Sequence, residues 1–240
     1  MSPSGAVRQL LMRTLSPAAA AWEYYFKPDL RDPFGGPFNG QHGRQAIFRE
    51  ILELLPVAGI VETGTFRAST TEYMASQTTA PIWTVEVRRR FFYFARMRLA
   101  RFGNVDLSVG DSRTFLQRLA GDPRVPKRGV FFYLDAHWYE DLPLRDEVAT
   151  VTRHWSEYVI MVDDFQVPDD PGYQFDDYGE GKRLCLDYLG PLARYGLHAF
   201  FPSISSTDES GMRRGSVILA DSAATTRLNR AATLQRPALR

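Results

Sequence analysis

The sequence of 240 residues contains a single cysteine, Cys185. One thiol excludes an intramolecular disulfide framework and a cysteine-rich zinc site. A chain of this length can bury enough apolar surface to fold without such cross-links. Because Cys185 lies in an apolar run, we interpret it as a small core residue rather than a nucleophile.

The chain also lacks an excess of charge of either sign. Lysine and arginine together number 29 and aspartate and glutamate 28, which gives a formal net charge of +1. This balance differs from the basic excess of many nucleic-acid-binding domains, so a nucleic-acid partner is not expected. Residues 88–101 are locally basic, with aromatic residues interleaved. They are either an RNA-binding surface or, as we favour, an amphipathic helix with a solvated basic face.

A long apolar run is absent as well. No stretch of the sequence approaches the roughly 20 apolar residues that a membrane-spanning helix needs. Near the N-terminus, Gln9 and Arg13 interrupt any signal-peptide core. We therefore expect a cytoplasmic protein without a membrane partner.

Composition divides the chain into three parts. Residues 1–40 combine a short helix, predicted at 7–15, with a segment at 18–26 that ends in an aromatic cluster and a glycine- and proline-rich loop at 32–40. Residues 41–222 form the main domain, and residues 223–240 are expected to be a mobile tail. The first part is rich in aromatic side chains: Trp22, Tyr24, Tyr25, Phe34 and Phe38. These either form a lid over a substrate, or pack in the core, or make the interface of a homodimer.

From Gly59 onward, apolar segments alternate with amphipathic ones. Strands are predicted at 60–62, 82–86, 105–109, 130–134, 158–162, 197–202 and 214–219. Helices are predicted at 41–55, 69–76, 89–102, 114–119, 144–155 and 181–195. Strand segments that are apolar without alternation fit a parallel sheet covered on both faces. We predict an α/β fold with a Rossmann-like, doubly wound, mostly parallel sheet, an antiparallel last strand and an N-terminal helical and loop lid.

Ligands of an open parallel sheet bind beyond the carboxyl ends of its strands. The first such end carries small and polar residues: Glu62, Thr63, Gly64, Thr65 and Ser69. Gly64 permits a tight turn and the close approach of a ligand, and Ser69 or Thr70 is placed to cap the next helix. A pyrophosphate-binding turn is disfavoured, because Phe66 and Ala68 replace the later glycines of that fingerprint. Glu62 suits a cationic or ammonium group instead.

The next two strand ends suggest a nucleoside. Glu86 closes the second strand, 24 residues after Glu62. An acid at this place can hold both hydroxyl groups of a ribose. Asp111 and Ser112 follow the third strand and could contact an adenine edge, cap the following helix, or do both.

The fourth and fifth strands end in acidic residues. Asp135 follows the fourth strand, and Asp163 and Asp164 follow the fifth. If these strands are neighbours, the three carboxylates repel one another unless a cation or a proton intervenes. Hard oxygen ligands favour Mg²⁺. The alternative is that these acids cap helices or pair with arginines.

In this order, the motifs Glu-Thr-Gly-Thr, Glu86, Gly-Asp-Ser, Leu-Asp-Ala-His and Val-Asp-Asp resemble those of class I S-adenosylmethionine-dependent methyltransferases. More narrowly, they resemble the Mg²⁺-dependent O-methyltransferases of the catechol and macrocin type. The resemblance covers about residues 59–165. The chain departs from that pattern in the first turn, which lacks the later glycine, and in having no evident catalytic lysine near the fourth strand.

The resemblance implies a role for each motif. The methionine part of S-adenosylmethionine would lie on the turn after the first strand, the ribose on Glu86, and the adenine near Asp111 and Ser112. The metal ligands would be Asp135, Asp163 and Asp164. The reaction would be methylation of a hydroxyl group on a small-molecule acceptor, with Mg²⁺ assisting.

His137 lies two residues after Asp135 and is expected to face the same cleft. It could be a general base, a metal ligand or a gate to the acceptor, and a neutral imidazole suits proton removal from a hydroxyl group. We therefore take Asp135 and His137 as candidate catalytic residues, with a loop-stabilising histidine as the alternative. Two other functions stay open: a metal-dependent hydroxylase on the same fold, and a non-catalytic nucleoside-binding protein.

Overall fold

The computed structural model describes residues 5–137 and 141–237, with side chains described from Leu15 onward. The first four residues of the predicted N-terminal segment and the last three of the predicted tail lie outside this range. Eight strands form one sheet: β1 (Gly59–Thr63), β2 (Ile82–Glu86), β3 (Val105–Val109), β4 (Val130–Leu134), β5 (Val159–Val162), β6 (His198–Pro202), β7 (Val217–Ala220) and β8 (Leu234–Gln235).

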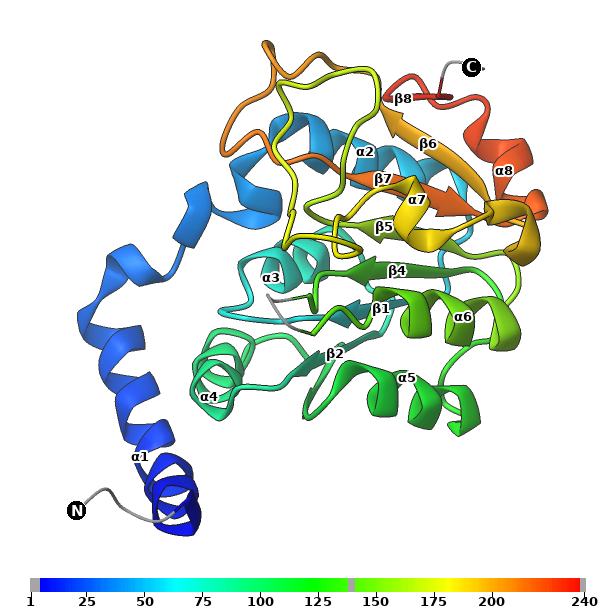
Figure 1. The fold of residues 1–240 in the computed structure, drawn as a ribbon. Coiled ribbons are helices and arrows are strands. Elements are labelled where there is room, and N and C mark those ends of the chain that lie inside the picture. The colour runs from blue at the N-terminus through cyan, green and yellow to red at the C-terminus, as the bar shows by residue number, and fades with distance from the viewer. Residues whose placement is uncertain (1–4, 138–140, 238–240) are drawn as a thin grey trace.

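The strands are arranged in the order β3-β2-β1-β4-β5-β7-β6-β8. The first five in this order pair in parallel, whereas β7 runs antiparallel to both β5 and β6. The predicted α/β class and mostly parallel sheet are confirmed. The strand predicted at 214–219 corresponds to β7 and is antiparallel as expected, but β8 follows it. Because β1 to β5 are parallel, all five carboxyl ends lie at one edge of the sheet (Figure 1).

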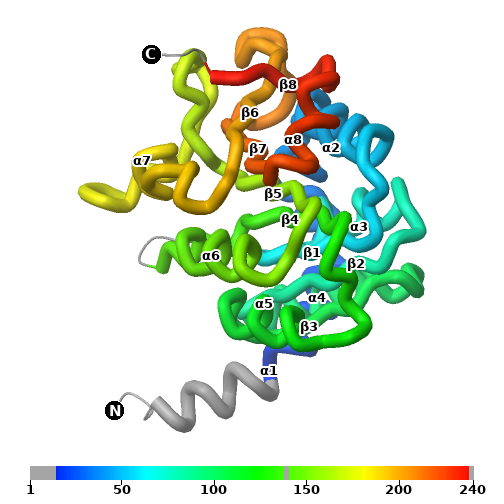
Figure 2. The backbone as a smooth tube through the Cα atoms, turned by 90° about the vertical axis from the view of Figure 1, so that its right-hand side faces the viewer, coloured from blue at the N-terminus to red at the C-terminus, as the bar shows by residue number. Residues whose placement is uncertain are grey.

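Helices cover both faces of the sheet. The main ones are α1 (Gly5–Phe26), α2 (His42–Leu54), α3 (Ser69–Gln77), α4 (Arg89–Arg98), α5 (Ser112–Gly121), α6 (Leu144–His154), α7 (Leu186–Leu189) and α8 (Ser222–Leu228). Figure 2 shows α6 and α7 on one side of the sheet and α2 and α3 on the other. Neighbouring residues of a strand therefore enter different cores: Ile60 packs with the α2 and α3 side, and Val61 with the α5 and α6 side.

The N-terminal segment is one long helix followed by a chain of short turns. Helix α1 continues through Pro17 to Phe26, beyond the short helix predicted at 7–15. It packs against α4 and leads into the 3₁₀ turns Pro28–Leu30, Pro33–Gly35 and Pro37–Gly40. We call residues 27–41 the strap, because they run along the carboxyl edge of the sheet from α1 to α2 (Figure 1).

Two predicted elements differ from the structure. The helix predicted at 181–195 is reduced to α7 and a 3₁₀ turn at Leu192–Tyr195. Gly181 and Gly190 both have positive φ, and Pro191 follows directly, so a continuous helix cannot form there. The tail predicted to be mobile from residue 223 is packed instead, because α8 buries Ala224 and Leu228 in the core.

One of the helix caps predicted from the sequence is observed, at α5, and the other, at α3, is not. Asp111 caps α5, accepting hydrogen bonds from the backbone N–H groups of Arg113 and Thr114 at 3.1 Å each. Neither Ser69 nor Thr70 caps α3, which begins after Ala68 in the left-handed conformation. The Thr70 hydroxyl accepts a hydrogen bond from the backbone N–H of Phe38 in the strap at 3.0 Å.

Within the described residues, none of the helices combines the length and the apolar character needed to cross a bilayer. The basic segment 88–101 forms α4 and the turn after it. Three of its arginines make ion pairs with acids of other elements: Arg90 with Glu23, Arg98 with Asp32, and both Arg98 and Arg101 with Glu72.

The turns after β1 and β4 are in direct contact. The backbone N–H of Asp135 donates a hydrogen bond to the carbonyl oxygen of Thr63 at 2.9 Å. Gly64 has φ +87°, and a Cβ atom at this position would lie 2.2 Å from the carbonyl oxygen of Asp135. The absence of a side chain at Gly64 is therefore needed by the fold itself, before any ligand is considered.

We predict that Gly64→Ala lowers the free energy of unfolding by about 1–3 kcal/mol, from left-handed backbone strain and the clash with Asp135. Urea denaturation measures the effect. Gly103→Ala is the matched control, because a Cβ atom there meets nothing within 4 Å. Equal stability of the Gly64 variant and the control would show that the two turns separate at little cost.

Candidate active site

The parallel strands bring most of the predicted site residues to one edge. Glu62 and Thr63 end β1, and Glu86 ends β2. The acids after β4 and β5 are adjacent because these two strands pair directly, with Leu134 opposite Val162. The structure thus places the predicted cofactor residues and the predicted metal ligands along a single line of strand ends (Figure 1).

Glu62 is buried beneath the turn after β1, with 1% of its surface exposed. Its Oε2 accepts hydrogen bonds from the hydroxyl groups of Thr71 and Thr84, both at 2.5 Å. The hydroxyl oxygen of Thr65 lies 2.5 Å from that of Thr84 and extends this hydrogen-bond network. Burial raises the pKa of Glu62 to about 7, although the two hydroxyl donors oppose the shift. Glu62 and Thr65 therefore fix the position of the turn.

Glu86 ties the same turn to β2. One carboxylate oxygen accepts a hydrogen bond from the backbone N–H of Phe66 at 2.8 Å, and the other from that of Arg88 at 2.7 Å. The residue is 5% exposed, and burial raises its pKa. Each carboxylate oxygen has a second lone-pair site, so Glu86 retains acceptor capacity for a ligand hydroxyl group.

Asp111 and Ser112 have different environments. Asp111 is partly exposed and pairs with Arg113 at 2.8 Å, which lowers the pKa of its carboxyl group. Ser112 is buried and lies beside Glu147 of α6, a residue that the sequence analysis missed. Burial raises the pKa of Glu147 to about 7. The clue to Glu147 is its place on the apolar face of α6, between Leu144 and Val151.

Two polar atoms near these residues are poorly partnered. Among the described residues, Thr63 Oγ1 and Glu147 Oε1 are buried without a well-aligned hydrogen bond, although the hydroxyl groups of Thr63 and Ser112 lie near enough to Glu147 to lower its pKa in part. Such atoms are uncommon in folded proteins and are usually satisfied by water or a ligand. They lie where β1 ends beside the start of α5 and α6, which is where the sequence predicts that the cofactor binds.

Asp135, His137 and Asp164 form the cluster that could hold a metal ion. One ligand atom from each can be chosen so that all three lie within 4.8 Å of one another. His137 Nε2 is 3.9 Å from Asp135 Oδ1 and 4.0 Å from Asp164 Oδ2. Burial and the neighbouring acids raise the pKa of Asp135, and raise that of Asp164 to about 7. These shifts are typical of acids whose mutual repulsion is not compensated.

Asp163 does not join this cluster, in contrast to the predicted set of three aspartates. Its carboxylate pairs with the buried guanidinium of Arg44 and accepts hydrogen bonds from the Tyr133 hydroxyl and from Asn39 Nδ2, the latter at 3.2 Å. Burial alone would raise the pKa of Asp163, but Arg44, the Tyr133 hydroxyl and the backbone N–H of Asp164 together outweigh burial and lower that pKa. Asp163 is therefore an ionised structural anchor.

Arg44 was missed by the sequence analysis although the sequence carries a clue. It lies on the face of α2 that also buries Ile47, Phe48 and Ile51, a spacing of three, four and seven residues. A charged residue on an otherwise apolar helix face needs a buried partner of opposite charge. Asp163 is that partner, 119 residues later in the chain.

Asp176 and Arg214 complete the charge balance of the cluster. Arg214 Nε donates to Asp164 Oδ1 at 2.7 Å, and its other arm pairs with Asp176. Asp176 Oδ2 is 3.7 Å from His137 Nε2. The groups joined by these contacts are four carboxylates, of Asp135, Asp163, Asp164 and Asp176, and two guanidinium groups, of Arg44 and Arg214, and Glu62 is a further acid near Asp135. When they are ionised, the acids outnumber the guanidinium groups, so the cluster carries an excess of negative charge that a cation would offset.

His137 supports a cation at this place. Its side chain is 3% exposed, and within the described residues its Nε2 has no hydrogen-bond partner. Burial lowers its pKa, which favours the neutral imidazole. A neutral imidazole nitrogen that faces carboxylates without a hydrogen bond to them is free to act as a metal ligand. The residues present therefore fit a divalent ion held by Asp135, His137 and Asp164.

The strap lies over this edge through three contacts. The Phe34 ring meets the Phe66 ring with centroids 6.1 Å apart, Phe38 is fully buried against Tyr133, and Asn39 reaches Asp163. Of the predicted lid residues, Phe34 and Phe38 thus belong to the strap. The other three are on α1: Tyr24, which packs on Phe94, and the exposed Trp22 and Tyr25.

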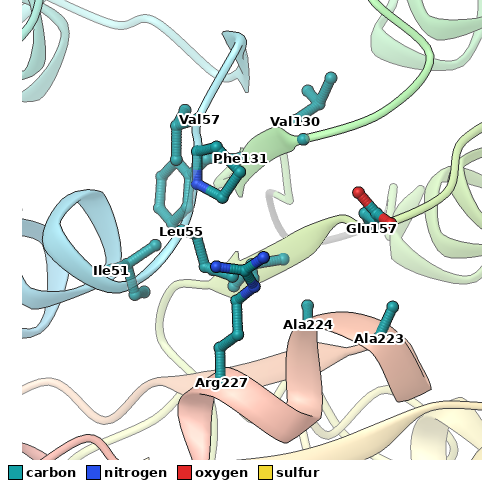
Figure 3. Close-up of a pocket in the computed structure, with 12 residues that line it drawn as sticks. Ile51, Leu55, Val57, Val130, Phe131, Glu157, Ala223, Ala224 and Arg227 are labelled. Atoms are coloured by element: carbon teal, nitrogen blue, oxygen red, sulfur yellow. The ribbon is translucent and has the colours of Figure 1, made fainter.

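A separate cavity of about 120 Å³ lies at the opposite edge of the sheet (Figure 3). It is enclosed by the end of α2, the start of β4 and α8, with Leu55, Val57, Phe131 and Arg227 among its lining residues. It contains none of the predicted site residues. The candidate site is therefore the carboxyl edge.

No protein-family model matches the chain, and no curated protein matches it either. Several solved structures match the chain. The O-methyltransferase TomG from Streptomyces achromogenes, involved in tomaymycin synthesis and solved with S-adenosylmethionine, is 18% identical with a TM-score of 0.52. The match covers 86% of this chain and 89% of TomG.

Two further solved structures share the same fold. An O-methyltransferase from Bacillus cereus, solved with S-adenosylhomocysteine, is 13% identical with a TM-score of 0.54, covering 90% of this chain and 97% of that one. CalS10, an amino pentose methyltransferase from Micromonospora echinaspora, is 16% identical with a TM-score of 0.52, covering 75% and 91%. The chain therefore has the fold of class I S-adenosylmethionine-dependent methyltransferases.

Proposed function

We propose that the protein transfers the methyl group of S-adenosylmethionine to a hydroxyl group of a small-molecule acceptor, with Mg²⁺ assisting. The observation that carries this proposal is the contact between Gly64 and Asp135. The turn expected to hold the cofactor touches the first residue of the metal-binding cluster. A methyl donor on one turn and an acceptor at the other would then be neighbours, and positioning supplies much of the rate of such a displacement.

The cofactor-binding residues divide by what they can contact. Glu86 would accept hydrogen bonds from the ribose hydroxyl groups, in addition to its two backbone donors. Thr63 and Ser112 offer hydroxyl groups on the α5 and α6 side, and Asp111 lies at the start of α5. S-adenosylmethionine supplies the electrophilic methyl group when it is bound.

Asp135, His137 and Asp164 would hold the ion, while Arg44 and Arg214 neutralise the remaining acids. When bound, Mg²⁺ supplies positive charge that makes a neighbouring hydroxyl group easier to deprotonate. His137 Nε2 can either ligate the ion or accept the proton of the acceptor, because one lone pair cannot do both. The strap, with Phe34 and Phe38 over the edge, would exclude water from the reacting groups.

A metal-dependent hydroxylase is the second candidate. The observation that favours it is the imidazole in the cluster, because nitrogen ligands suit redox-active ions such as iron better than Mg²⁺. The two functions differ in their products. Accumulation of S-adenosylhomocysteine during turnover supports methyl transfer, whereas cofactor binding without transfer to any acceptor supports a nucleoside-binding protein.

We predict that Glu86→Ala weakens S-adenosylmethionine binding by about 1–3 kcal/mol, because charge-assisted hydrogen bonds to the ribose are lost. Calorimetric titration measures the affinity, and a thermal melt reports any loosening of the turn at Phe66. Asp106→Ala is the control, since Asp106 is an acid on β3 that is half exposed. An unchanged affinity in the folded Glu86 variant would contradict the ribose assignment.

The two neighbouring aspartates after β5 should respond differently to the same change. We predict that Mg²⁺ raises the melting temperature of the wild type and has no effect on Asp164→Asn, because a ligand of the native state is lost. We predict that Asp163→Asn lowers stability by about 3–5 kcal/mol even without metal, because Arg44 is left buried and unpaired.

Thermal melts with and without millimolar MgCl₂ measure both effects. Asp187→Asn, at an exposed acid of α7, is the control and should match the wild type. A wild type that ignores Mg²⁺ would contradict magnesium binding. Equal behaviour of the two aspartate variants would contradict the division between a metal ligand and a structural anchor.

A further inference from the structure

Helix α1 has one face covered by the rest of the molecule and one exposed apolar face. Successive residues of an α-helix are separated by about 100° around its axis. Leu15, Trp22 and Phe26, spaced by seven and four residues, therefore share one face, with Ala18 and Tyr25 beside them. Ser16, Ala20 and Glu23 lie on the opposite face and are buried.

The buried face of α1 packs against α4 and against the turn after β1. Glu23 pairs with Arg67 of the turn after β1, at 3.4 Å, and with Arg90 of α4. The Tyr24 ring meets the Phe94 ring edge-on, with centroids 5.3 Å apart. This side of α1 therefore needs no further partner, and Figure 1 shows the helix beside α4 at the periphery of the molecule.

The other face, which we call the α1 stripe, is exposed. Its large side chains are Leu15, Trp22, Tyr25 and Phe26, with exposures of 60%, 57%, 63% and 64%. The Trp22 and Phe26 rings pack on each other at 4.6 Å, so they form one continuous surface. Scattered exposed apolar residues are ordinary in soluble proteins, but a continuous stripe of this kind marks an interaction surface.

We propose that the α1 stripe binds the same stripe of a second copy of this chain, in an antiparallel helix pair about a two-fold axis. Two observations favour a second copy. Glu23, the only charged residue described between Leu15 and Phe26, is turned away and neutralised within its own chain. Pairing two identical stripes therefore brings no like charges together, which is the condition for a two-fold contact.

The area of the stripe is also sufficient. An aromatic side chain can bury about 150–250 Å². Four large side chains that are each exposed by more than half would contribute roughly 500 Å² per copy, or about 1,000 Å² for the pair. That total reaches the lower limit of specific protein interfaces. The contact would also fix α1, and with it the start of the strap.

Light scattering after gel filtration tests the proposal. At roughly 50 μM, well above a micromolar dissociation constant, the wild type should have twice the 27.3 kDa mass of one chain. Trp22→Glu/Phe26→Glu should be monomeric, with an unchanged circular dichroism spectrum. Met212→Glu, at a residue 45% exposed outside the stripe, is the matched control and should remain dimeric.

A cysteine at the centre of the stripe tests the two-fold geometry. In the background Cys185→Ser, the variant Ala18→Cys should form a disulfide-linked dimer on oxidation, because a residue near the axis faces its own copy. A monomeric wild type would overturn the proposal. So would a double variant that remains dimeric, or a monomer whose stripe instead binds anionic lipid vesicles.

Discussion

The buried ion pair between Arg44 and Asp163 is the constraint on which the carboxyl edge depends. Both side chains are almost completely buried, so neither charge could remain without the other. Through Asp163 the pair joins β5 to α2, to Tyr133 of β4 and to Asn39 of the strap. Through its second arm, Arg44 also donates to the carbonyl oxygens of Arg214 and Gly215 before β7. Five segments of the chain thus meet at one ion pair.

This pair also decides which acids are left for chemistry. Because Asp163 is neutralised by Arg44, the carboxylates that face the edge are those of Asp135 and Asp164, with His137 between them. Arg214 compensates part of the remaining charge through Asp164 and Asp176. The site thus carries an excess of negative charge, and a buried imidazole lies where a third carboxylate was expected.

The sequence predicts β2 and β4 well because burial on both faces leaves a local signature, and it also identifies the edge strand β3, none of whose residues is buried. The bounds expected at 82–86, 105–109 and 130–134 are those observed for β2, β3 and β4. Its failures have local and distant causes. The helix expected at 181–195 is interrupted by its own glycines at positive φ. The tail after residue 223 is held by the distant residue Glu50, which accepts hydrogen bonds from the backbone of Ala232 and Thr233. The role of Asp163 depends on Arg44, far away in the chain.

The strap shows the same dependence on tertiary contacts in its backbone. Six of its residues have positive φ: Phe34, Gly35, Gly36, Phe38, Asn39 and Gly40. For the three that are not glycine, this conformation costs about 1 kcal/mol or more each. The local backbone preferences of these residues therefore oppose the observed path of the strap, so tertiary contacts must stabilise it. Phe38 is buried among aromatic rings, and the Asn39 carbonyl accepts a hydrogen bond from the N–H of Met212. Because Asn39 also donates a hydrogen bond to Asp163, the Arg44 ion pair adds to these contacts in holding the strap over the site.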